Sequence, residues 1–261
     1  MNKLSGKKVV FTKAIACLGA FPSIALISTP CQAHPIVPVA LVYSGPGACA
    51  EDCVTAAENI ALMAGMETKR VKQNALTIFS TKKDVEKLFH DVAVWIQPGG
   101  TSVDAMKAMT PRLKSEIQNF VRSGGGYVGF CAGAFASTDI VGDSNTHGLG
   151  LIPGMSHLYP IPTTEATIEP VNWQGKTRYL YWEGGPYLDQ VANVPGTEII
   201  GTYGNGTVAA VRSQVGKGRA FVSGIHPEAP QWWRTYYDLN DKDGADFDLG
   251  VEMVQWASRA Q

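Results

Sequence analysis

The residue with the strongest chemical signature is Cys131, in the segment GGGYVGFCAGAF. It follows an apolar run that predicts a strand, and glycines stand two positions before and after it, at Gly129 and Gly133. This spacing is typical of a nucleophile elbow, a strand-to-helix turn so tight that larger side chains would collide. The turn puts the thiol at a helix start, where thiolate is favoured and the Ala132 amide can hold an oxyanion. A structural cysteine in a glycine-rich turn is the alternative.

A base for such a thiol lies in the segment GKGRAFVSGIHPE, where His226 and Glu228 follow another apolar run. Residues i and i+2 of an extended chain point to the same side, and Pro227 disfavours helical backbone at His226. The Glu228 carboxylate can then orient one imidazole nitrogen while the other faces a thiol, as in a catalytic triad. The alternative is an ordinary histidine and glutamate in a surface loop.

A second oxyanion donor is expected at Gly99 or Gly100, which follow the apolar run ending at Gln97. Ligands bind outside the carboxyl ends of parallel strands, so this loop and those at Cys131 and His226 should meet at one sheet edge. A plain Pro-Gly-Gly turn is the alternative.

The elements that must position these loops alternate between strand and helix in the first half of the chain. Apolar runs predict strands at 37–43, around Val71, at 92–97 and at 127–130. Helical spacing and caps predict helices over 51–64, 82–90 and 111–122. The alternation predicts an α/β protein with a mainly parallel central sheet, covered by helices on both faces.

The second half of the chain has a different pattern, with strands joined by tight turns. These strands are predicted at 166–173, 178–182, 198–203 and 207–215. A further strand at 219–224 leads to His226, and a closing helix covers 247–257. We therefore expect an added antiparallel β section in the C-terminal half.

Five segments give the chain a resemblance to a known family: LVYSGPGA, QPGG, GGYVGFCAG, YWEGGPYL and GKGRAFVSGIHPE. In order and spacing they resemble the N-terminal domain of eukaryotic-type biotin–protein ligases, which is similar to class I glutamine amidotransferases. The resemblance covers most of 37–230 and implies a flavodoxin-like fold with a Cys-His-Glu triad at Cys131, His226 and Glu228. It also implies substrate-binding turns at Gly45, Gly47, Gly184 and Gly185. Because no ligase domain follows, biotin ligation is not expected.

Residues 1–33 have the pattern of a secretory signal peptide. Four lysines without an acid precede an apolar stretch, and Cys31 and Ala33 are small residues before a cut at His34. We expect cleavage near Ala33, a periplasmic or secreted protein with no stable membrane insertion, and one domain at 34–261. An uncleaved membrane anchor is the alternative.

This cleavage leaves the cysteines Cys49, Cys53 and Cys131. Cys49 and Cys53 are four residues apart and share a face if they lie on one helical turn. They are the candidate disulfide in an oxidising compartment, and two unpaired small residues are the alternative. Cys131 is then the odd thiol.

The formal net charge of −1 gives no broad basic field, so no nucleic-acid partner is expected. Histidine spacing does not fit a metal site, and no cofactor is implied. The acid-rich run 238–248 is interpreted as a solvated loop. The aromatic pairs 232–233 and 236–237 are expected to pack against the C-terminal helix rather than line a cleft.

The sequence therefore predicts an exported cysteine-nucleophile amidotransferase or amidohydrolase that acts on a small-molecule or peptide amide. A cysteine peptidase or cell-wall amidase is the enzyme alternative. The non-enzyme alternative is a binding module that has this fold but no turnover.

Overall fold

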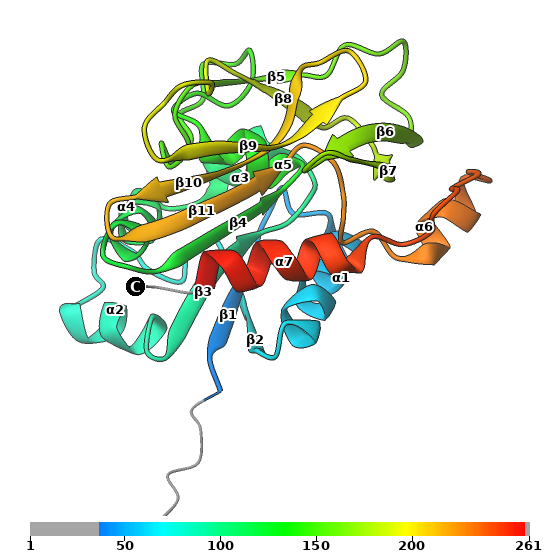
Figure 1. The fold of residues 1–261 in the computed structure, drawn as a ribbon. Coiled ribbons are helices and arrows are strands. Elements are labelled where there is room, and N and C mark those ends of the chain that lie inside the picture. The colour runs from blue at the N-terminus through cyan, green and yellow to red at the C-terminus, as the bar shows by residue number, and fades with distance from the viewer. Residues whose placement is uncertain (1–36, 259–261) are drawn as a thin grey trace, which may run out of the picture. The chain divides into compact units, whose positions relative to one another are not determined.

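An eleven-stranded sheet forms the centre of this computed structural model, which describes residues 37–258 (Figure 1). Nine strands follow the order β2-β1-β3-β4-β11-β10-β9-β6-β7. The strands are β1 Val39–Tyr43, β2 Glu67–Val71, β3 Val92–Gln97, β4 Gly126–Phe130, β5 Met155–Leu158, β6 Thr167–Trp173, β7 Lys176–Trp182, β8 Pro186–Asp189, β9 Thr197–Tyr203, β10 Val208–Val215 and β11 Gly218–Ser223. The predicted signal peptide lies outside the described residues.

The sheet changes direction at β11. Strands β2, β1, β3, β4 and β11 are parallel to one another. Strands β10, β9, β6 and β7 continue the sheet in antiparallel pairs, and β8 joins β5 to β10. The expected parallel section and the added antiparallel section are both confirmed.

Helices cover both faces of the parallel section. The helices are α1 Ala50–Met63, α2 Lys82–Leu88, α3 Ser102–Ala108, α4 Pro111–Arg122, α5 Ala132–Ser137, α6 Gln231–Tyr236 and α7 Phe247–Ser258. One buried core includes Ile60 of α1 and Met253 of α7. These two helices lie side by side (Figure 1). The other core includes Met106 of α3 and Ile117 of α4. Among the described residues, no helix is long and apolar enough to span a bilayer.

Local sequence explains why helix α4 begins where it does. The side chain of Thr110 accepts a hydrogen bond from the Leu113 amide, and Pro111 occupies the first helical position of α4. The buried side chains of α4, Leu113, Ile117 and Val121, recur every four residues and so share one face. This helix has the predicted bounds, 111–122.

Candidate active site

Three neighbouring parallel strands bring the candidate residues to one edge of the sheet. In the register, Gln97 at the end of β3 lies opposite Gly129 of β4, and Phe130 lies opposite Ser223 of β11. The loops after these three strands therefore begin side by side. They carry Gly99 and Gly100, Cys131, and His226 with Glu228, respectively. The adjacency comes from strand order, because β11 is far from β4 in the sequence.

Cys131 occupies a backbone conformation that few L-residues adopt. Its φ is 48° and its ψ is −100°, between the end of β4 and the start of α5. A side chain at Gly129 would place its Cβ 2.6 Å from the carbonyl carbon of Gly133, so the turn requires glycine there. A strained non-glycine residue in a turn this tight is the geometry of a nucleophile elbow. The thiol is free, and 5% of the residue is exposed.

His226 and Glu228 form a buried hydrogen-bonded pair. The Nδ1 atom of His226 lies 2.8 Å from Oε1 of Glu228, and the two residues are 4% and 1% exposed. The His226 amide also donates to the carbonyl of Tyr181 over 2.9 Å, which fixes the backbone. With Nδ1 held by the carboxylate, Nε2 is the ring nitrogen left for a second partner.

The surroundings of His226 favour its charged form. Burial opposes the imidazolium, but the negative charge of Glu228 and the nearby Cys131 sulfur outweigh burial and raise the pKa of His226 well above its usual value. His226 is therefore suited to hold a proton beside the Cys131 sulfur.

The amides expected to hold an oxyanion have no backbone partners among the described residues. Gly100 forms an antiparallel bridge with Ala48. The hydrogen bonds of this bridge are made by the flanking residues: the Cys49 amide donates to the carbonyl of Gly99, and the Thr101 amide donates to the carbonyl of Gly47. In this arrangement the Gly100 N–H points away from the bridge. Ala132 is the first residue of α5, so its N–H lies before the helical bonds begin.

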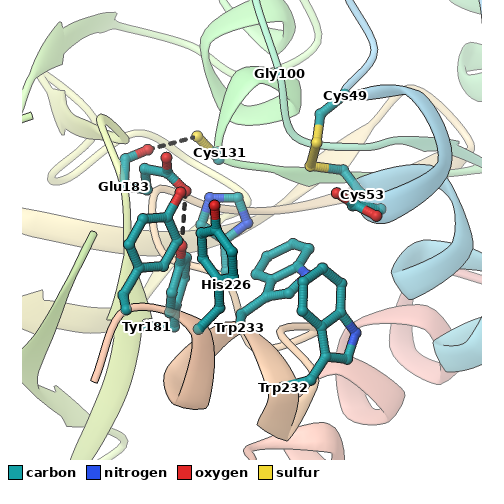
Figure 2. Close-up of a pocket in the computed structure, with 12 residues that line it drawn as sticks. Cys49, Cys53, Gly100, Cys131, Tyr181, Glu183, His226, Trp232 and Trp233 are labelled. Carbon is teal, nitrogen blue, oxygen red and sulfur yellow. Dashed lines mark hydrogen bonds between the residues drawn. A yellow bond between two sulfur atoms is a disulfide. The ribbon is translucent and has the colours of Figure 1, made fainter. Parts of the chain in front are cut away.

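Cys131 and His226 open into one cavity of about 520 Å³. Its other lining residues are Cys49, Asp52, Cys53, Gly100, Tyr181, Glu183, Trp232, Trp233, Tyr236 and Tyr237. Figure 2 shows Glu183 and Tyr181 on one side of Cys131 and the two other cysteines on the opposite side. The aromatic pairs of α6 thus line a cleft, contrary to the expectation that they pack against α7.

Helix α6 is held over the cavity by a buried arginine. Arg234 is fully buried and forms ion pairs with Asp241 and Asp246, the latter over 3.1 Å. Asp246 also binds Arg178 of β7 at 2.9 Å. The acid-rich run is therefore not simply a solvated loop, because its carboxylates tie α6 to the sheet. No group of at least three metal-ligating side chains occurs within residues 37–258.

Cys49 and Cys53 are joined by a disulfide in the first turn of α1. This disulfide lines the cavity, and a Cβ added at Gly99 would lie 3.2 Å from the Cys53 sulfur. The same Cβ would lie 2.8 Å from Cε1 of His226. The Gly99 turn therefore packs between the disulfide on one side and the imidazole of His226 on the other.

The four glycines implied by the family resemblance do not line the Cys131 cavity. Gly45 lines a separate hollow with Arg70 and Lys72, and Gly47 packs against Ala105 of α3. Gly184 directly follows the cavity residue Glu183, whereas Gly185 packs against the backbone of Gly224. Sequence reasoning did not single out these cavity residues: Tyr181 and Glu183 stand in the segment YWEGGPYL, of which only the glycines were interpreted, and Asp52 stands in no motif.

Comparison with known proteins shows which family this chain resembles. A family model described as the N-terminal part of biotin–protein ligase matches residues 39–149, which include the elbow at Cys131. Over this part of its length, the chain is similar to the N-terminal part of biotin–protein ligase. A biotin–protein ligase of Schizosaccharomyces pombe is 24% identical in an alignment of 160 residues that covers 52% of this chain and 25% of the ligase. The match thus spans about a quarter of that relative.

Solved structures share the fold of this chain. A glutamine amidotransferase has a TM-score of 0.53 at 21% identity and covers 73% of this chain and 90% of its own. A putative GMP synthase protein of Thermoplasma acidophilum has a TM-score of 0.53 at 11% identity, with coverages of 87% and 98%. PurLQS of Thermotoga maritima has a TM-score of 0.52 at 16% identity, with coverages of 83% and 98%. The fold is therefore class I glutamine amidotransferase-like.

Proposed function

We propose that this protein is an exported amidohydrolase or amidotransferase that attacks an amide carbonyl through Cys131. The observation that carries the proposal is the strained turn that presents Cys131 to a cavity shared with His226, whose ring is hydrogen-bonded to buried Glu228. The glutamine amidotransferase-like fold supports the same reaction class.

In the first half of the reaction, the Cys131 thiolate attacks the amide carbon and the carbonyl oxygen becomes an oxyanion. The amides of Gly100 and Ala132 donate hydrogen bonds to that oxygen, as both are free of backbone partners. The imidazolium of His226 gives its Nε2 proton to the leaving nitrogen, and the C–N bond breaks. A thioester on Cys131 and a free amine or ammonia result.

In the second half, neutral His226 takes a proton from water, and the resulting hydroxide attacks the thioester. The oxyanion forms at the same two amides. Sulfur then leaves as thiolate and restores the ion pair with His226. Glu228 keeps the ring orientation throughout and stabilises the imidazolium in both half-reactions.

Export is part of the proposal because the disulfide Cys49–Cys53 suits an oxidising compartment. N-terminal sequencing of protein recovered outside the cytoplasm should begin at or near His34. Intact Met1 in protein recovered from the cytoplasm would contradict the export claim without affecting the chemistry.

The function is tested by screening glutamine, short peptides and cell-wall fragments for release of ammonia or amine. Wild type and Cys131→Ser are compared, because serine keeps the shape of the nucleophile but is a far weaker one at neutral pH. Release that depends on Cys131 supports the proposal. The substrate that is cleaved distinguishes a glutaminase from a peptidase or cell-wall amidase. Reaction of Cys131 with a thiol probe no faster than that of a free cysteine would instead favour a binding module.

A further inference from the structure

The charges around the cavity do not suit an anionic substrate. Two carboxylates, Asp52 and Glu183, are among its lining residues, and no lysine or arginine is. The α-carboxylate of a free amino acid such as glutamine would find His226 as its only cationic partner there. His226 is already engaged with Glu228, so that carboxylate would lie unpaired beside two negative charges.

Glu183 is the better placed of the two carboxylates to contact a substrate at the sulfur. Its main-chain carbonyl oxygen lies 3.6 Å from the Cys131 Sγ. Its Oε2 accepts a hydrogen bond from the Tyr181 hydroxyl over 2.7 Å, so the carboxylate is held at the cavity wall. Tyr237 lies close to the same carboxylate, and the charge of Glu183 is the main reason that the pKa of Tyr237 is raised.

Aromatic rings surround the same space at differing tilts. Tyr181 and Trp233 have centroids 5.2 Å apart and planes at 57°, while Trp232 and Trp233 are 6.1 Å apart at 87°. Tyr237 lies 6.4 Å from Tyr181 at 45°. Trp232 and Tyr237 are 51% and 41% exposed, whereas Tyr181 and Trp233 are buried behind them. Accessible aromatic rings together with a carboxylate are the composition that binds ammonium groups through cation–π attraction.

We propose that this cavity binds an ammonium group, and that the substrate is an amide with a positive charge near its scissile carbonyl. The amide part of this statement rests on the proposed function. The ammonium part rests only on the carboxylates and the rings, so it is testable without turnover.

The test uses two thiol reagents of opposite charge, 2-(trimethylammonium)ethyl methanethiosulfonate and 2-sulfonatoethyl methanethiosulfonate. The Cys131 thiolate attacks the sulfenyl sulfur, a mixed disulfide forms, and methanesulfinate leaves with the electron pair. Labelling rates are measured on the full chain at low salt, by mass analysis of the peptide that contains Cys131. Each rate is divided by the rate of the same reagent with 2-mercaptoethanol.

We expect the normalised rate to favour the cation by about tenfold, since an aromatic face and a partly exposed carboxylate each contribute roughly two- to fivefold. Glu183→Gln and Trp232→Leu should each lower this ratio by about threefold. The matched control is Glu67→Gln, at the amino end of β2 and so at the opposite edge of the sheet. It should leave the ratio unchanged.

A ratio of one or less in wild type overturns the ammonium site. A ratio in Glu183→Gln as high as that of wild type overturns it as well. Failure of the proposed function has a separate signature. If the ratio is near tenfold but Cys131→Ala retains full amide turnover, the ammonium site stands and the nucleophile assignment falls. If turnover depends on Cys131 but the ratio is one, only the substrate class is wrong.

Discussion

The Nδ1 atom of His226 lies 2.8 Å from Oε1 of Glu228, and both side chains are almost fully buried. The second carboxylate oxygen, Oε2, has no hydrogen-bond partner among the described residues. An unsatisfied oxygen on a buried carboxylate is destabilising. A carboxylate that lowers stability in this way is typical of a functional site, where it is retained to orient and charge a neighbouring group.

Glu228→Gln should lower the pKa of His226, because the amide keeps a hydrogen-bond acceptor near Nδ1 but removes the charge that favours imidazolium. The pKa is measured by NMR titration of the ring signals, with His226→Gln used to assign the signal. An unchanged pKa in Glu228→Gln would show that the carboxylate does not set the charge of the ring.

The same pair gives stability a pH dependence. Because the folded pKa of His226 is raised, its contribution to the free energy of unfolding is complete below about pH 6.5 and is lost as pH rises through the folded pKa. The stability advantage of wild type over Glu228→Gln should therefore shrink from pH 6 to higher pH. Urea unfolding of both proteins across this window measures it, and an advantage that grows with pH would contradict the assignment.

Cys131 and His226 should behave as one unit. Cys131→Ala should abolish turnover without unfolding the domain, and His226→Ala should lower the rate by about 10²–10⁴. The double variant should be little worse than Cys131→Ala, because residues that serve one step are not additive. Steady-state kinetics on the substrate found by the screen decide this, with circular dichroism as the folding control. Additive losses would place the two residues in different steps.

Gly99→Ala should lower activity by about 10²-fold, since the new methyl would lie 2.8 Å from Cε1 of His226 and displace the ring. Gly204→Ala is the matched control, because its added carbon would meet its nearest neighbour at 3.9 Å. The measurement is kcat/KM for both variants, alongside their unfolding midpoints. Equal kcat/KM values in the two variants would show that Gly99 does not restrain the imidazole.

Loss of the disulfide in the double variant Cys49→Ser/Cys53→Ser should destabilise the fold by about 2 kcal/mol, the entropy of closing so short a loop. Both thiols should resist alkylation until reductant is added, while Cys131 reacts without it. Masses before and after reduction count the thiols. Alkylation of Cys49 and Cys53 in unreduced exported protein would reject the bridge.

Arg234→Met should lower stability by about 3–5 kcal/mol, because it leaves buried Asp246 with one fewer cationic partner. It should also lower kcat/KM, since α6 supplies one wall of the cavity. Arg112→Met, which breaks the partly exposed pair with Glu116, should cost less than about 1 kcal/mol. Denaturant unfolding compares the two, and equal losses would contradict the role given to Arg234.

Much of the parallel section could be predicted from sequence because β1, β3 and β4 are largely buried apolar runs and because α2 and α4 begin with threonine caps. The strand 92–97 and the helix 111–122 have the predicted bounds. Helix α3 and strands β5 and β8 were not predicted. They are seven, four and four residues long, too short to establish a periodic pattern.

The candidate site was predictable where chemistry requires special backbone. Cys131 lies between glycines that its turn requires. The extended chain predicted at His226 is wrong, because the Ala229 amide donates to the His226 carbonyl over 3.1 Å and closes a turn, across which His226 and Glu228 still meet. Glu183 and Tyr181 carried no such signal, because β7 reaches the cavity only through the long-range order of the sheet. Helix α6 was missed because its position depends on buried Arg234, whose partners lie farther along the chain.

The central claim is that the Cys131 sulfur becomes acylated. Wild type mixed with the activated ester 4-nitrophenyl acetate and quenched in acid should gain the mass of one acetyl group on the peptide that contains Cys131. Cys131→Ala should gain none there and should release nitrophenolate at the rate of an unfolded control. Acetylation absent from Cys131 in wild type, with ester or amide turnover that persists in Cys131→Ala, would contradict the claim.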